Sequence, residues 1–92
     1  MELKVQGNRI IIDGSIKTIT DAQTIIDALK NINSDTIILV INESFQIPSS
    51  VLGYLVKLYN EGKTISIETK SDILYELLDD LSLTSTLNVK KI

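Results

Sequence analysis

The sequence Thr36-Ile37-Ile38-Leu39-Val40-Ile41 contains the longest unbroken apolar run of the chain, Ile37–Ile41. Polar residues precede this run at Asn33-Ser34-Asp35 and follow it at Asn42-Glu43-Ser44. An apolar run of this length is typical of a buried central strand, and it is far too short to cross a membrane. We therefore predict that residues 37–41 are buried, with both faces of the strand covered or nearly so.

On the N-terminal side of this run, the sequence predicts a hairpin and then a helix. Apolar and polar residues alternate over Glu2–Gln6, and Arg9-Ile10-Ile11-Ile12 follows after Gly7-Asn8, which is typical of an antiparallel hairpin with a two-residue turn. Apolar residues then recur at helical spacing over about residues 21–31. Thr20 and Gln23 have the spacing of a capping box at the start of this helix.

On the C-terminal side, we expect a second helix over Val51–Asn60, ended by Gly62, and then an alternating strand over residues 63–68. Ser71 can cap a third helix, and a short strand near residues 87–89 follows it. The third helix has one apolar stripe, predicted to face the core, which consists of Ile73, Leu74, Leu77, Leu78 and Leu81.

The alternation of strands and helices predicts the fold class. We expect one α/β domain over residues 1–92, with a mixed sheet of about five strands, about three helices and right-handed crossovers. The chain has 92 residues, of which 43% are hydrophobic, so it can build one compact core and not two.

The composition excludes several classes of function. Nine Lys and Arg against twelve Asp and Glu give a net charge of −3, so a nucleic-acid partner is not expected. The chain has no Cys and no His, so it lacks a thiolate nucleophile, the commonest general base and the usual zinc ligands. Asp72, Glu76 and Asp79 have helical spacing opposite an apolar stripe, which is typical of a solvated face. We expect no metal, no cofactor and no membrane insertion.

The second predicted helix is apolar around more of its circumference than one buried face needs. At 100° per residue its apolar arc spans roughly 200° and has Tyr54 and Leu58 at one border. That border favours a partly exposed apolar surface of the kind that binds partners, although an edge strand or loop that covers it is the alternative. Gly53 weakens this helix by about 1 kcal/mol relative to Ala, so we expect compensation such as the close approach of another backbone.

Ser49 and Ser50 follow Pro48 where the second helix starts. A hydroxyl at this position can cap the helix, with a contribution of about 1 kcal/mol. The free N–H groups and the positive end of the helix dipole also make this the most favourable place for a phosphate group.

The segment Pro48-Ser49-Ser50-Val51-Leu52-Gly53 and the elements around it resemble the STAS domain. This module occurs in anti-sigma-factor antagonists, sulfate-transporter tails, stressosome components and bacterial lipid-transport ABC systems. Its signature is an apolar strand, a loop, then Asp-Ser-Ser-Gly-Leu-Gly opening a helix. Pro48 replaces the signature Asp, and Val51 replaces its first Gly. The resemblance covers essentially the whole chain, with matching segments in the order Ile37–Ile41, Ser49-Ser50, Leu52-Gly53, Glu61-Gly62-Lys63, Ile65–Ile67 and Leu78–Leu83.

The resemblance implies a cytoplasmic protein-binding module, not an enzyme. Its partner would be an anti-sigma factor or another kinase-like regulator, which would phosphorylate Ser49 or, as the second candidate, Ser50. The alternative is a STAS subunit that binds the nucleotide-binding protein of a lipid-transport ABC system without phosphorylation. In either case the predicted partner-binding residues are Pro48, Ser49, Ser50, Gly53, Tyr54, Lys57 and Leu58. The sequence does not determine the oligomeric state.

Overall fold

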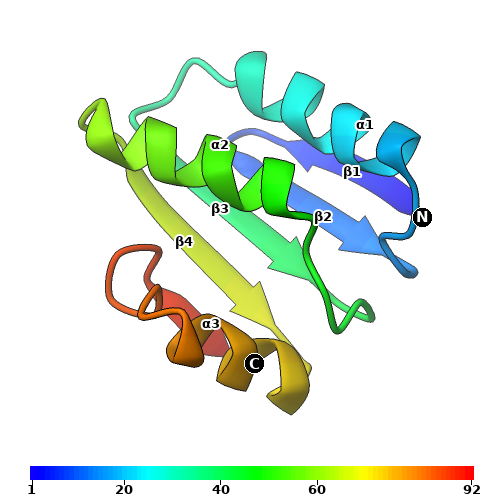
Figure 1. Cartoon of the computed structure of the whole chain (residues 1–92). Helices are drawn as coiled ribbons and strands as arrows, with labels where there is room; N and C mark the ends of the chain where they lie inside the picture. The colour runs from blue at the N-terminus through cyan, green and yellow to red at the C-terminus, as the bar shows by residue number, and fades with distance from the viewer.

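The computed structural model describes all residues 1–92 and has the predicted α/β fold, a five-stranded mixed sheet with three helices (Figure 1). None of these helices has the length and apolar character that crossing a membrane requires. In chain order the elements are β1 (Glu2–Gln6), β2 (Arg9–Asp13), α1 (Ile19–Lys30), β3 (Thr36–Ile41), α2 (Ser49–Asn60), β4 (Thr64–Thr69), α3 (Asp72–Asp80) and β5 (Val89–Lys91).

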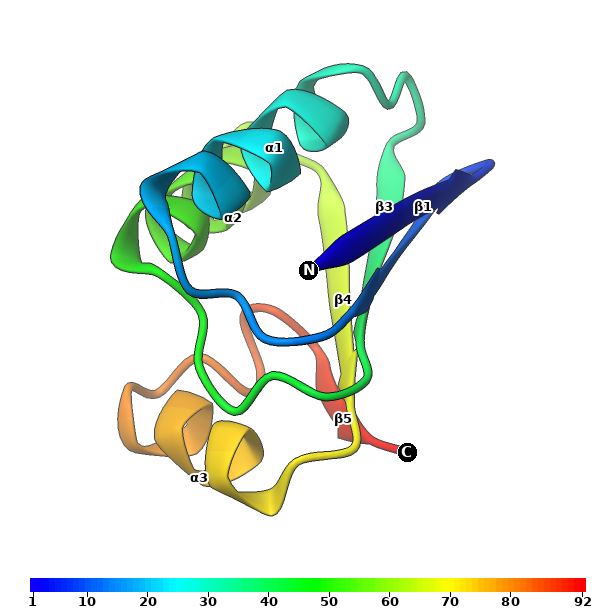
Figure 2. The same ribbon diagram turned by 90° about the vertical axis from the view of Figure 1, so that its right-hand side faces the viewer.

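The strands lie in the sheet in the same order as in the chain. β1 pairs antiparallel with β2, and β2, β3, β4 and β5 are parallel to one another. Crossovers between parallel strands are right-handed, so a strand order that advances in one direction places every crossover helix on the same face. Figure 2 shows α1, α2 and α3 together on one side of the sheet. The N-termini of all three helices therefore lie at the edge where the parallel strands end.

The core lies between this inner face of the sheet and the helices. In β3 the side chains of Ile37, Leu39 and Ile41 are fully buried. Leu39 is in register with Ile10 of β2 and Ile67 of β4, and both of these are buried as well. The helices cover this row with apolar side chains at helical spacing, which are Ala22, Ile25 and Leu29 in α1, Val51, Leu55 and Leu58 in α2, and Leu74 and Leu78 in α3.

The outer face of β3 has no helix over it, which corrects the expectation that both faces are covered. Val40 is nevertheless buried, whereas Ile38 is partly exposed. Arg9 and Glu68 lie on the two strands that flank β3, and their side chains form an ion pair with an N–O distance of 3.0 Å across it. The aliphatic parts of these long side chains can cover apolar surface while their charged ends stay in water.

Two helix starts differ from the prediction. α1 begins at Ile19, and Thr18 rather than Thr20 caps it, since the Thr18 hydroxyl accepts from the Asp21 N–H at 3.0 Å. The Asp21 carboxylate accepts in return from the Thr18 N–H, which completes the capping box. α2 begins at Ser49, before the predicted Val51.

Truncation of Leu39 to alanine should destabilise the domain by about 2–5 kcal/mol, because it leaves a cavity in the buried row between three strands. Ile38→Ala, one position away on the outer face, is the matched control and should have a clearly smaller effect. Urea unfolding of both variants measures the difference. Equal losses of stability would contradict the assignment of the two faces.

Candidate functional site

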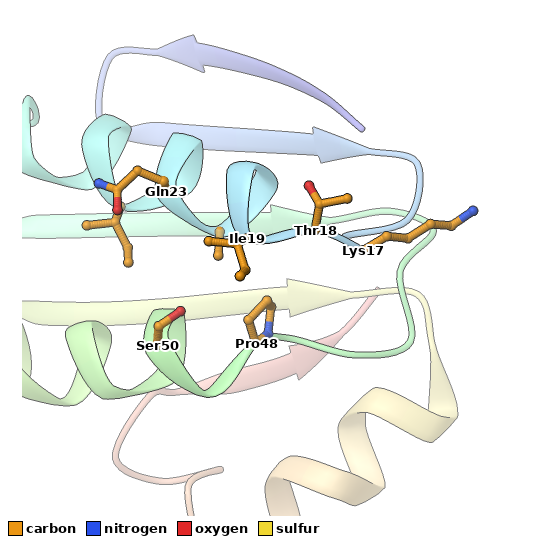
Figure 3. A pocket seen from close by; sticks show the side chains of 8 residues that line it. Lys17, Thr18, Ile19, Gln23, Pro48 and Ser50 are labelled. Carbon is orange, nitrogen blue, oxygen red and sulfur yellow. The ribbon is translucent and has the colours of Figure 1, made fainter.

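A groove of about 320 Å³ lies between the N-terminal ends of α1 and α2. Figure 3 shows Ile19 and Gln23 of α1 on one side of it and Pro48 and Ser50 of α2 on the other. Ile19 is 90% exposed and is the most exposed of the large apolar side chains of the molecule. Lys17 lies at one end of the groove with its ammonium group pointing away from it (Figure 3), and no acidic residue lines the groove.

Ser44 fixes the two loops that position this groove. It is buried in the loop before α2, and its hydroxyl accepts from the Ile16 N–H in the loop before α1 at 3.3 Å. The same hydroxyl donates to the Gln46 carbonyl at 2.8 Å, and the Gln46 side-chain amide donates back to the Ile16 carbonyl at 3.4 Å. These bonds hold the start of α2 at a fixed place beside the start of α1.

Two more side chains of the loop before α2 bond to the end of β2. The Asn42 amide donates to the Asp13 carboxylate at 2.7 Å, and Glu43 accepts from the Gly14 N–H at 3.2 Å. Sequence reasoning did not identify Ser44 or these bonds. Ser44 and Ile16 are 28 positions apart, and no local pattern in the sequence indicates a bond over that separation.

The start of α2 has no side-chain cap, so the prediction that Ser49 or Ser50 caps it is wrong. Pro48 occupies the N-cap position, and both serine side chains are exposed. The N–H groups of Val51 and Leu52 donate to the Pro48 carbonyl, whereas those of Ser49 and Ser50 make no hydrogen bond within the chain. Two backbone donors and two hydroxyl groups therefore face solvent at this end of the helix.

The other two helices have occupied N-termini. Ser71 caps α3 by accepting from the Leu74 N–H, and Asp72 lies in the first turn of that helix. In α1 the Asp21 carboxylate accepts from the Lys17 and Thr18 N–H groups, and the Lys17 bond is the main cause that lowers the pKa of Asp21 below its usual value. A carboxylate that stays ionised is already present at the start of α1, whereas the first turn of α2 contains no acidic residue.

Tyr54 and Lys57 lie on the α1 side of α2. Tyr54 is partly buried, with the ammonium groups of Lys30 and Lys57 at 6.0 Å and 5.6 Å from the centre of its ring. These distances are at the range of a cation–π contact. Leu58 differs from the prediction, because its side chain is buried in the core and adds nothing to the surface.

Gly53 is exposed in the middle of the same surface. A Cβ atom placed on it would meet no other atom within 4 Å, so the close backbone approach expected from the sequence is absent within this chain. The structure thus brings Ser49, Ser50, Gly53 and Lys57 together on one exposed face of α2, beside Pro48, Tyr54 and the groove.

Comparisons with protein-family models, curated proteins and solved structures found no match for this chain. No group of three or more His, Cys, Asp or Glu side chains is arranged to hold a metal ion. The chemistry that the site offers is apolar contact beside exposed backbone donors and hydroxyl groups.

Ser44→Ala should destabilise the domain by about 1–3 kcal/mol, because it leaves the Ile16 N–H and the Gln46 carbonyl without their partner in a buried place. Ser49→Ala is the control. The Ser49 hydroxyl caps nothing, so this change should alter stability by less than about 0.5 kcal/mol. Urea unfolding tests both, and a loss for Ser49→Ala as large as that for Ser44→Ala would contradict the two assignments.

Proposed function

We propose that this chain is a STAS-like regulatory module that acts in the cytoplasm by binding a protein partner, without catalysis of its own. The observation that carries the proposal is the exposed start of α2, where Ser49 stands at an uncapped helix terminus next to an apolar groove. The partner would be an anti-sigma factor or another kinase-like regulator.

The position of Ser49 supports the resemblance on which this proposal rests. The signature expects an apolar strand, a loop and a Ser-Ser pair that opens a helix. In this chain β3 is followed by a loop over residues 42–48, and Ser49 is the first residue of α2. The helix ends before Gly62, which has a φ angle of 97°, and a strand and a further helix follow in the expected order.

The free donors at the start of α2 suit a phosphorylated Ser49. A phosphate group carries a charge of about −1.5 to −2 at neutral pH, and a helix N-terminus stabilises such a charge. The Ser49 and Ser50 N–H groups are unpaired, and no acidic residue in the first turn repels the added charge. Phosphorylation of Ser49 would then change the charge at the exposed start of α2 while the fold stays as it is.

Gly53 supports a partner that lies close to α2. A glycine inside a helix costs about 1 kcal/mol relative to alanine, and no contact within this chain requires it. A missing side chain at an exposed position lets the surface of another protein come nearer to the helix backbone.

The alternative is that the chain is a STAS subunit bound to the nucleotide-binding protein of a lipid-transport ABC system. Pro48 favours it, because this residue replaces the acidic residue of the signature that precedes the phosphorylated serine. The alternative uses the same surface and needs no phosphate on Ser49.

Gly53→Ala should stabilise the free domain by about 0.5–1 kcal/mol, because the added methyl group meets no atom and the helix propensity improves. The same change should weaken binding to the partner encoded next to this chain. Lys4→Ala, at an exposed position of β1, is the binding control. If Gly53→Ala binds as tightly as the unchanged protein, α2 is not the closely approached surface.

Ser49→Asp should weaken binding to the same partner, because it places a negative charge at the exposed start of α2, where the partner is proposed to bind. Ser49→Ala should keep the affinity, since it removes no helix cap. Isothermal titration with the co-encoded kinase-like protein or ABC subunit measures both affinities. Equal affinities, together with no phosphate on Ser49 after incubation with that protein and ATP, would remove the switch and favour the constitutive transporter subunit.

A further inference from the structure

α3 exposes an apolar stripe that the core does not use. Ile73, Leu77 and Leu81 follow one another at intervals of four residues, and their exposed fractions are 63%, 39% and 52%. Of the five apolar residues predicted to face the core, only Leu74 and Leu78 are buried. A helix of nine residues thus buries two large apolar side chains and shows three along one side, Leu81 being its C-cap.

This stripe lies on the side of α3 that is turned toward α2. Successive residues of a helix are turned by 100°, so the residue just before a buried one lies on a fixed flank of the helix. On α2 this flank faces α1, since Tyr54 precedes the buried Leu55 and lies near Lys30 of α1. Ile73 precedes Leu74, and Leu77 precedes Leu78, in the same way. Both helices run in the same direction over the same face of the sheet, so the same flank of each faces the preceding helix (Figure 1).

α2 does not cover the stripe. α3 packs on β4 and β5, and Figures 1 and 2 both show it set apart from α2. The flank of α2 opposite Tyr54 is also apolar, with Leu52 and Val56 partly buried and Tyr59 exposed. Both α2 and α3 thus have apolar side chains on the flanks that are turned toward each other.

The charged residues of α3 itself are all acidic. α3 contains four acidic residues, Asp72, Glu76, Asp79 and Asp80, and no basic residue. Asp72 is paired with Lys91, and the other three carboxylates have no basic partner. The apolar stripe of α3 is therefore bordered by a negatively charged surface.

We propose that the α3 stripe, Ile73, Leu77 and Leu81, is the docking surface for an amphipathic helix of a partner protein whose apolar face is flanked by Lys and Arg. The stripe extends over about 12 Å, the length of eight helical residues, which matches partner anchors spaced at i, i+4 and i+7. A second copy of this chain would bring two acidic helices together, and an anionic membrane would face the same repulsion. A basic helix satisfies both the apolar and the charged parts of the surface.

This inference goes beyond the proposed function, because it concerns α3 and does not use Ser49 or the start of α2. Two synthetic peptides test it. Both form a helix with leucine at i, i+4 and i+7, and the flanking positions are lysine in one and glutamate in the other. Fluorescence anisotropy measures their binding to the full chain. We expect the lysine peptide to bind, with an affinity that falls as salt rises, and the glutamate peptide to bind at least tenfold more weakly.

The variants Ile73→Ser and Leu77→Ser should each weaken binding of the lysine peptide about tenfold. Ile73 is mostly exposed, so its replacement leaves the fold intact, which circular dichroism verifies. Ile19→Ser is the matched control, because it makes the same substitution at an exposed isoleucine of the α1–α2 groove. It should leave the affinity for the lysine peptide unchanged. Ser49→Asp should also leave it unchanged, so this proposal and the proposed function can fail separately.

Three results would overturn the proposal. The first is equal binding of the lysine and glutamate peptides, or no binding of either. The second is a loss of binding in Ile19→Ser as large as that in Ile73→Ser. The third is a dimer of the unchanged chain in sedimentation that Leu77→Ser dissociates, which would assign the stripe to a second copy.

Discussion

The right-handed connection between neighbouring parallel strands is the constraint on which the arrangement of this molecule depends. Since β2 to β5 lie in the sheet in chain order, each right-handed crossover places its helix on the same face. The buried inner face of the sheet is then covered by the three helices, and all helix N-termini lie at one edge of the sheet. The other face has no helix, and there the Arg9–Glu68 ion pair spans the central strand.

The candidate site follows from this arrangement and from the loops that it brings together. Two loops leave neighbouring strands at the same edge, and the buried Ser44 hydroxyl joins them. The start of α2 is thereby held in place although it has no cap of its own. α2 lacks two features that stabilise helices. It has no side-chain cap, and it contains a glycine in its interior; both the cap position and Gly53 lie at its exposed face. Local rules broken on one surface of an otherwise consistent fold are typical of a functional surface.

The sequence predicted those features that depend on local pattern. The hairpin around Gly7-Asn8, the buried strand at residues 36–41 and the α2 end near Gly62 all show in residue type and spacing. The sequence-based prediction was wrong where the choice between two nearby residues for the same role depends on the fold. Thr18 and Thr20 are both possible caps, and the loop geometry decides for Thr18. Ser49 can cap a helix by its residue type, but the structure places Pro48 at the cap position.

The remaining differences concern what covers an apolar face, which no local pattern contains. The run at residues 37–41 does not say that Val40 is buried while Ile38 on the same face is partly exposed. The apolar spacing of α3 does not separate Leu74, which is buried, from Ile73, which is exposed. Which of these apolar residues is buried depends on the strand order and on the distance of α3 from α2. The sequence therefore identifies the apolar residues but not their exposure.

The central claim is that the exposed start of α2 is where a partner binds, and amide hydrogen exchange tests it most directly. In the free chain the unpaired N–H groups of Ser49 and Ser50 should exchange without protection. After addition of the protein encoded beside this chain, the amides of residues 49–54 should become protected, and the exchange rates of β1 and β2 should not change. Protection confined to β1 and β2, with the start of α2 unchanged, would contradict the account.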